Sequence, residues 1–133
     1  MSHTATSALT VSDWEEAPVD TLDSGTSLTR ATSRSEFSGQ WQGTGLACWV
    51  LVYTADGAAR FVGTQTFSGT LDGRTGTFVL ALQGTFEEST AKVSWSVLPG
   101  TGTGDLAGLT GSGGYESVSD APSASATLAY DGV

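Results

Sequence analysis

The sequence predicts an all-β protein, a single antiparallel eight-stranded β-barrel with little or no helix. Three observations lead to this prediction. Only 14% of the residues are charged, against roughly 25% in ordinary soluble proteins, and Thr and Ser supply the polarity instead, with Gly interspersed. Asp-Gly pairs mark hairpin turns. Between the turns, hydrophobic and polar residues alternate, which is the period of a strand with one buried face.

Turn residues divide the chain into candidate strands. Asp56-Gly57 and Asp72-Gly73 are strong hairpin signals because Asp-Gly readily adopts the positive φ of tight turns. The prolines Pro18, Pro99 and Pro122 are expected between strands, where a missing N–H group breaks no ladder. One domain spans residues 1–133, and its predicted strands are residues 4–14, 26–38, 41–54, 59–69, 76–86, 90–98, 113–118 and 124–131.

The predicted strand 41–54 is apolar on both faces. One face carries Trp41, Trp49, Leu51 and Tyr53, and the other carries Leu46, Cys48, Val50 and Val52. This pattern predicts a core on one side and a subunit contact on the other, hence a homo-oligomer, either a dimer or a trimer. Which face points inward stays open, because Gly43 and Gly45 could introduce a bulge. Cys48 is expected to be a small core residue rather than a nucleophile.

Charge and hydropathy exclude several classes of protein. The net charge is −9, with five Lys and Arg residues, so the chain lacks the basic surface that binding to nucleic acid requires. The N-terminal residues carry no signal-peptide pattern. The longest apolar run, Leu46–Tyr53, is far shorter than the ~20 residues that span a bilayer. We therefore expect a cytoplasmic, soluble protein without nucleic-acid or membrane partners.

A glycine-rich stretch from Leu98 to Tyr115 resembles a phosphate-binding loop at first sight. A dinucleotide fingerprint must open a helix whose N-terminus holds the phosphates. Here Gly108 and Gly111 interrupt any helix, and Asp105 would place a carboxylate beside the phosphates. The stretch is therefore interpreted as a connection that crosses one end of the barrel and helps to shape its mouth.

Cofactor and metal chemistry find little support in the sequence. His3 is the only histidine and lies near the N-terminus. The pairs Glu15-Glu16 and Glu87-Glu88 alternate across strand faces or occupy turns, so neither pair needs to converge on a metal ion. Cys48 and the serines have no internal histidine base. We expect no cofactor and no metal.

The predicted interior is strongly aromatic. It could simply be packed core, since side chains can fill an eight-stranded barrel, or it could form a pocket for a flat or apolar small molecule. In the second case Gln65 and Tyr53 are the candidate catalytic or orienting residues. The candidate substrate-binding residues are Trp41, Trp49, Phe61, Phe67, Phe78, Leu80, Leu82, Trp95, Tyr115 and Tyr130.

Several motifs carry a resemblance to a known family. These include Phe37-Ser-Gly39, the segment Gly69–Phe78 and, most specifically, Pro99-Gly-Thr-Gly-Thr-Gly-Asp-Leu-Ala-Gly-Leu-Thr-Gly111. Over nearly its whole length the chain resembles the bacterial domain-of-unknown-function family 3224. The resemblance implies the calycin-like barrel of allene oxide cyclases and the related dirigent proteins.

The chain departs from that family where titratable groups are usual. Gln40, Gln42 and Thr44 stand where the family carries acidic residues, Gln65 stands where it tends to have Glu, and Leu82 lies where a His is often found. If these positions face the cavity, then a ligand meets no acids or bases there. What remains for its recognition is the shape of the cavity, its apolar surface and neutral hydrogen bonds.

The resemblance and the interior together leave three functions open. The first is a cofactor-free cyclase or isomerase that templates an apolar, conjugated, natural-product-like substrate by proximity and exclusion of water. The second is a non-catalytic carrier of a hydrophobic metabolite. The third is a structural oligomer with a filled barrel.

Overall fold

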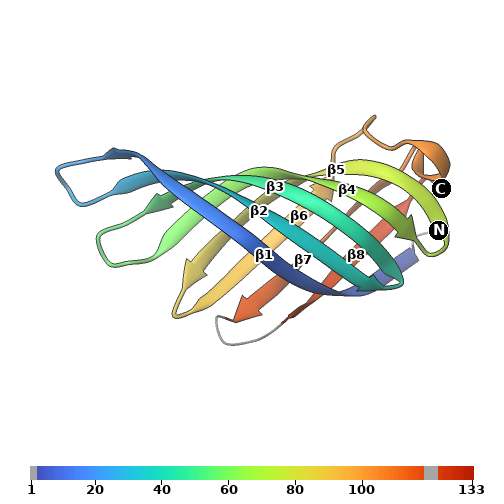
Figure 1. Cartoon of the computed structure of the whole chain (residues 1–133), viewed down its shortest axis with the longest axis horizontal. Coiled ribbons are helices and arrows are strands. Elements are labelled where there is room, and N and C mark those ends of the chain that lie inside the picture. The colour runs from blue at the N-terminus through green and yellow to red at the C-terminus, as the bar shows by residue number, and fades with distance from the viewer. Residues whose placement is uncertain (1–2, 119–122) are drawn as a thin grey trace.

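The chain folds into a closed eight-stranded barrel, as predicted (Figure 1). The structure, a computed structural model, describes residues 3–118 and 123–133. Each strand pairs antiparallel with its neighbours in sequence, and β8 closes the barrel against β1. The elements are β1 (His3–Thr21), β2 (Ser27–Gly39), β3 (Trp41–Tyr53), β4 (Ala59–Leu71), β5 (Arg74–Glu87), β6 (Thr90–Val97), η1 (Gly104–Leu106), β7 (Thr110–Val118) and β8 (Ala124–Asp131).

The two Asp-Gly turns lie where the sequence predicts them. Asp72 and Gly73 have φ values of 49° and 82° and connect β4 to β5. Gly57, with a φ of 89°, donates its backbone N–H to the carbonyl of Thr54 in the turn between β3 and β4. Both turns use the left-handed backbone region that Gly and Asp tolerate best.

Strand β1 is longer than predicted, and Pro18 lies inside it. The expectation that all three prolines fall between strands is therefore wrong for Pro18, whereas Pro99 follows β6 and Pro122 lies outside the described residues. Pairing of β1 with β8 extends only to Leu9, and the described residues beyond Leu9 pair with β2 alone. A register shift also follows Pro18. Proline is tolerated at such a one-sided, irregular position because it interrupts no continuous ladder.

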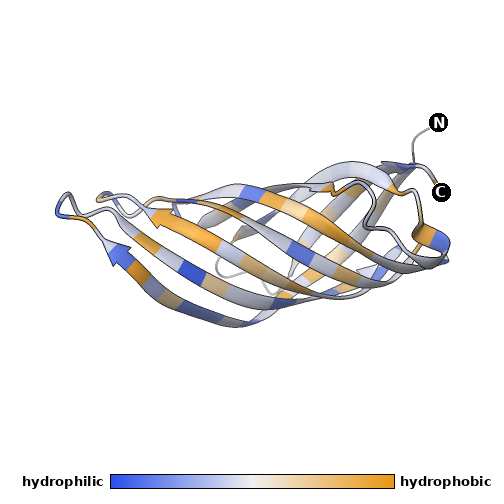
Figure 2. Cartoon of the chain, turned by 90° about the horizontal axis from the view of Figure 1, so that it is seen from above, coloured by the Kyte–Doolittle hydropathy of each residue, from blue (hydrophilic) through white to orange (hydrophobic). Residues whose placement is uncertain are grey.

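Hydrophobic and hydrophilic residues are interspersed along the strands (Figure 2), and buried side chains alternate with exposed ones. On β3 the Trp41 and Trp49 side chains point inward and are buried, while Leu46 and Val50 point outward and are 46% and 43% exposed. The register of β3 with β4 keeps this parity through the two glycines. Cys48 lies on the exposed outer face, so the expectation that it belongs to the core is wrong. Its even position places it outside together with Leu46 and Val50.

A β-bulge interrupts the alternation in β1. Ser12 pairs with Arg34 and Glu15 pairs with Thr32, so β1 advances by one residue more than β2 between these two pairs. Asp13 has a φ of 54° and its carboxylate lies 3.5 Å from Nε of Arg34. Because the bulge adds one residue, inward-facing positions are odd before it and even after it. Trp14 and Glu16 consequently face the barrel interior.

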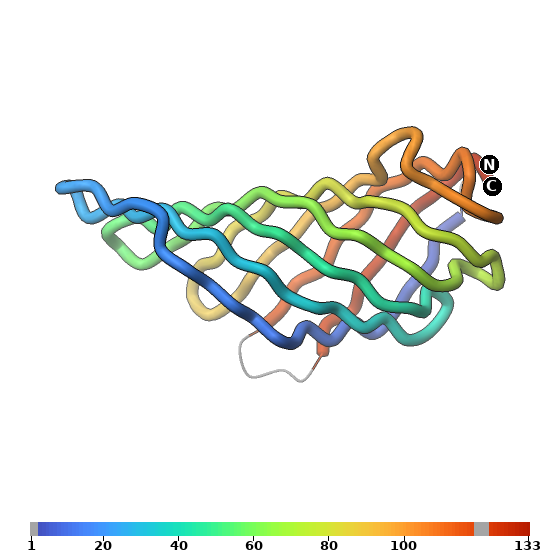
Figure 3. Tube along the Cα trace, turned by 45° about the horizontal axis from the view of Figure 1, so that its top comes forward, coloured from blue at the N-terminus to red at the C-terminus, as the bar shows by residue number. Residues whose placement is uncertain are grey.

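The two ends of the barrel differ. The β1–β2 and β3–β4 hairpins project beyond β5–β6 at the end opposite the termini, which gives that end an oblique rim (Figures 1 and 3). At the other end the glycine-rich connection runs along the start of β5, and its own Leu106 and Leu109 are fully buried in the core. Gly76 permits this contact, because a Cβ there would lie 2.1 Å from the carbonyl oxygen of Thr103.

The glycine-rich connection is held by β5 and not shaped for a phosphate. Thr103 donates its backbone N–H to the carbonyl of Thr77, and Asp105 accepts a hydrogen bond from the backbone N–H of Thr75. Only the single turn η1 follows the glycines.

In the described part of the chain, no helix has the length and hydrophobicity needed to span a membrane.

Candidate functional site

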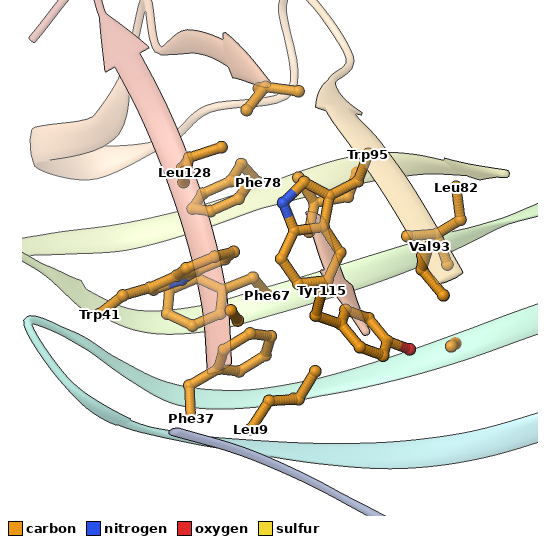
Figure 4. Packing of buried hydrophobic residues seen from close by; sticks show 14 of the residues in the cluster. Leu9, Phe37, Trp41, Phe67, Phe78, Leu82, Val93, Trp95, Tyr115 and Leu128 are labelled. Carbon is orange, nitrogen blue, oxygen red and sulfur yellow. The ribbon is translucent and has the colours of Figure 1, made fainter. Parts of the chain in front are cut away.

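The barrel interior is packed in one half and hollow in the other. In the half nearer the chain termini, aromatic rings fill the space. Phe37 stacks on Trp41 with ring centroids 4.5 Å apart, and the ring centroids of Phe67 and Phe78 lie 4.9 Å apart (Figure 4). Trp41 also contacts Trp95 edge-to-face at 5.3 Å. Such close aromatic packing leaves no room for a ligand at this level.

At the oblique end the interior opens into a cavity of about 340 Å³, which we call the mouth cavity. Its volume lies within the range of roughly 300–1,000 Å³ that is typical of small-molecule sites. Six of the eight strands contribute to its wall. The lining residues are Val11, Trp14, Glu16, Trp49, Leu51, Tyr53, Ala59, Phe61, Phe86, Ala91, Val93, Tyr115 and Ser117.

Aromatic rings form the walls of the mouth cavity. Trp49 meets Phe61 edge-to-face, with centroids 5.2 Å apart and planes at 90°, and Trp14 lies 6.2 Å from Trp49. The indole N–H of Trp49 donates a 3.1 Å hydrogen bond to the buried hydroxyl of Ser33, which fixes the ring. Gly84 makes room for the Phe61 ring, since a Cβ there would lie 2.6 Å from its Cε1 atom.

Glu16 places a carboxylate at this apolar wall. Its Oε2 atom accepts hydrogen bonds from the hydroxyls of Thr29 (2.6 Å) and Tyr53 (2.7 Å), and its Oε1 atom accepts one from the indole N–H of Trp14 (2.9 Å). Partial burial by itself raises the pKa of Glu16, but these three hydrogen bonds outweigh it and hold the pKa below its usual range. Glu16 is therefore ionised at neutral pH.

The neighbouring phenols stay protonated. Partial burial, the hydrogen bond to Glu16 and the charge of Glu16 raise the pKa of Tyr53 to about 12. Burial alone raises the pKa of Tyr115 to about 12. The mouth cavity thus presents one anionic carboxylate and two neutral phenols among apolar side chains.

The structure divides the predicted site residues between the two halves of the barrel. Tyr53, Trp49, Phe61 and Tyr115 line the mouth cavity. The remaining predicted substrate-binding residues are buried but belong to the packed core and do not line this cavity; they are Trp41, Phe67, Phe78, Leu80, Leu82, Trp95 and Tyr130.

Gln65, predicted as an orienting residue, also lies away from the mouth cavity. It is 1% exposed and pairs in register with Ala47 and Leu80. Its Nε2 atom has no hydrogen-bond partner among the described residues. An unpaired buried amide is costly, and Gln65 is not among the described residues that line the mouth cavity.

Reasoning from the sequence missed Trp14 and Glu16. Strict alternation from Leu9 and Val11 places Asp13 and Glu15 inside, and only the bulge at Asp13 reverses this. The one available signal is Asp13 itself, because Asp adopts the left-handed region more readily than most residues. Asp13 alone does not distinguish a bulge inside a long strand from a turn at the end of a shorter one.

Comparison with known proteins agrees with this architecture. The sequence matches the family described as "Protein of unknown function (DUF3224)" over residues 5–130. The fold is similar to the crystal structure of a DUF3224 protein of unknown function from Shewanella oneidensis MR-1, with a TM-score of 0.78 and 23% sequence identity, covering 100% of this chain and 99% of that one. No curated protein matched the sequence. The family match extends from the first inward-facing residues of β1 to the end of β8, and the chain therefore belongs to the DUF3224 family.

Proposed function

We propose that this protein binds a small, predominantly apolar molecule in the mouth cavity. The observation that carries the proposal is the hollow half of the barrel, a cavity of about 340 Å³ that the described residues wall mainly with aromatic and aliphatic side chains and the carboxylate of Glu16. Ligand sites typically combine a mainly hydrophobic lining with a few placed polar groups. The packed half of the barrel would act as the scaffold that holds these walls in position.

The protonation states favour binding over proton transfer. A general base works best when its pKa lies near the working pH, whereas the pKa of Glu16 is lowered and that of Tyr53 is raised to about 12. The hydroxyl of Tyr53 also donates its hydrogen bond to Glu16, so this proton is already engaged. These properties suit recognition and orientation of a ligand better than acid–base chemistry.

A second candidate is a cofactor-free cyclase or isomerase that templates a conjugated substrate. The fixed perpendicular arrangement of Trp49 and Phe61 favours it, because a rigid corner can select one conformer of a flexible molecule. The resemblance to allene-oxide-cyclase-type barrels points in the same direction. The test is the rate at which a bound conjugated polyene is converted. If the polyene is converted no faster with the protein than without it, this candidate is ruled out.

Binding can be tested with N-phenyl-1-naphthylamine, a neutral probe whose fluorescence increases in apolar surroundings. We expect saturable fluorescence with the wild-type protein. Ala91→Phe, which introduces a ring at the cavity wall, is expected to weaken binding at least about tenfold. Ala81→Phe is the matched control, because Ala81 pairs with Thr64 on the outer face of the barrel.

Two results would contradict the proposal. One is the absence of saturable binding by the wild-type protein. The other is equal weakening by both alanine substitutions, which would place the probe elsewhere. Circular dichroism of each variant distinguishes loss of the cavity from loss of the fold.

A further inference from the structure

The charge of Glu16 is not balanced by any cation on the wall of the mouth cavity. In the ranges 3–118 and 123–133, the lining contains no Lys, Arg or His side chain, and Glu16 is its only charged residue. The other ionisable lining residues, Tyr53 and Tyr115, are neutral. Whatever enters the cavity therefore meets an uncompensated negative charge beside apolar surface.

The hydrogen-bonding capacity of this carboxylate is largely used. A carboxylate offers about four acceptor positions, and Thr29, Tyr53 and Trp14 together occupy three of them. Little remains for a ligand that needs several hydrogen bonds, such as a primary ammonium group. The charge, in contrast, acts on any cation nearby without directional demands.

Aromatic rings surround the same position. The lining includes the rings of Trp14, Trp49, Tyr53, Phe61, Phe86 and Tyr115. Aromatic faces attract cations, and clusters of such faces are suited to quaternary ammonium groups, which carry no N–H donors. Trp14 and Tyr53 belong to this wall and both donate hydrogen bonds to Glu16, so the anionic group and the aromatic wall adjoin each other.

The rim of the cavity is acidic as well. The hairpins at the oblique end carry Asp20, Asp23, Asp56, Glu87 and Glu88, and no basic residue lies in the turns that join these strands. Of the five Lys and Arg residues, Arg74 begins β5 at the other end of the barrel, and the remaining four are exposed on outer strand faces: Arg30, Arg34, Arg60 and Lys92. An acidic rim raises the local concentration of cations and repels anions.

From these observations we infer that the mouth cavity takes an organic cation, a tertiary or quaternary ammonium compound with an apolar body. The inference rests on the proposed function and specifies its ligand class. The aromatic and aliphatic side chains of the lining would hold the body of the ligand. The carboxylate of Glu16 and the faces of Trp14 and Trp49 would hold its charged end.

An isosteric pair of probes tests this charge preference. Phenyltrimethylammonium and tert-butylbenzene have the same shape and differ in a quaternary nitrogen against a carbon. Each competes with bound N-phenyl-1-naphthylamine, and direct calorimetry provides a second measurement. We expect phenyltrimethylammonium to bind about tenfold more tightly than tert-butylbenzene at low ionic strength, with a smaller difference in high salt.

A matched pair of variants locates the preference. Glu16→Gln should remove most of the advantage of the cation, measured within that variant as the ratio of the dissociation constants of the two compounds. Glu15→Gln removes the same formal charge from the adjacent residue, which pairs with Thr32 on the outer face. That variant should retain the preference for the cation.

The possible outcomes separate the two claims. Equal or tighter binding of tert-butylbenzene by the wild-type protein would overturn the inference and leave the proposed function standing. An unchanged preference in Glu16→Gln, or an equal loss in both variants, would also overturn it. If neither compound nor the naphthylamine bound, the proposed function itself would fail.

Discussion

The phenolic hydroxyl of Tyr53 donates a 2.7 Å hydrogen bond to Oε2 of Glu16, which ties the end of β3 to the part of β1 beyond the bulge. Thr29 on β2, the strand between them, donates to the same oxygen. Three adjacent strands are thus joined at one carboxylate where the rim of the barrel begins. The bond also contributes to the lowered pKa of Glu16 and, together with burial, to the raised pKa of Tyr53.

Titration of the tyrosines provides the first prediction. The chain has three tyrosines, and the pKa of each is raised to about 12, by burial in all three and additionally by Glu16 for Tyr53 and by Asp72 for Tyr130. Absorbance at 295 nm should therefore show no ionisation near pH 10 while the protein is folded. The same titration in urea should show all three ionising near 10.

The stability of the folded protein should also depend on the protonation of these three tyrosines. Because folding raises these pKa values above the unfolded value of 10.0, their contribution is complete below pH 10 and is lost as the pH rises toward about 12. The free energy of unfolding should fall across that interval. A tyrosine that titrates normally in the folded protein would contradict the geometry described for it.

The bulge at Asp13 makes a second prediction, because it supplies one residue more than the pairing needs. Deletion of Asp13 would leave Ser12 opposite Arg34 and Glu15 opposite Thr32, with Trp14 and Glu16 still facing inward. It also removes a left-handed residue, which costs roughly 1–2 kcal/mol outside glycine. We expect unchanged binding of the naphthylamine and an equal or higher melting temperature.

Deletion of Thr10 is the control for the Asp13 deletion. Thr10 pairs with Glu36 in a regular stretch of the β1–β2 ladder, which has no extra residue there. Its loss should therefore lower the melting temperature and disturb the register of β1. If both deletions were equally damaging, the bulge would not have the role assigned to it.

The third prediction concerns Gln65. Its Nε2 atom is buried without a partner among the described residues, and leaving such a group unsatisfied costs about 1–3 kcal/mol. Gln65→Leu, which keeps a similar volume, should therefore increase the free energy of unfolding in urea by an amount of that order. A decrease would show that the amide makes an interaction that this structure does not contain. A loss of ligand binding would restore Gln65 as a site residue.

The outer face of β3 provides the fourth prediction. Leu46, Val50, Val52 and, beside them on β4, Val62 are between 38% and 56% exposed. We propose that this face joins copies of the chain, as the apolar pattern of strand 41–54 predicts. Light scattering should show an oligomer that Val50→Lys dissociates. Val118→Lys, at an exposed valine on β7, should leave it intact. A wild-type monomer at micromolar concentration would contradict the proposal.

The barrel could be predicted from the sequence because its signals are local. Asp-Gly turns specify hairpins, and the alternation in β3 puts Trp41 and Trp49 on one face, although the sequence left open which face points inward. The side chain of Cys48 follows the same parity and faces outward, although its apolar neighbours favoured a place in the core. Parity along a strand was the better guide than average hydropathy.

The site was harder to predict because it depends on two non-local facts. The first is the bulge at Asp13, which turns Glu16 inward. The second is the division of one aromatic interior into a packed half around Trp41 and a hollow half around Trp49. Trp41 and Trp49 have the same alternating surroundings in the sequence. The packed and hollow halves of the barrel differ in how far the surrounding strands extend, and this is not visible in either local pattern.

The four tryptophans allow the central claim to be tested directly. Trp14 and Trp49 line the mouth cavity, whereas Trp41 and Trp95 lie in the packed core. Titration of ¹⁵N-labelled protein with N-phenyl-1-naphthylamine, with indole signals assigned by single Trp→Phe variants, reports on both regions at once. If the mouth cavity is the binding site, the indole resonances of Trp14 and Trp49 shift in a saturable manner, and those of Trp41 and Trp95 stay in place. Unchanged Trp14 and Trp49 resonances at saturating probe, or shifts confined to Trp41 and Trp95, would contradict it.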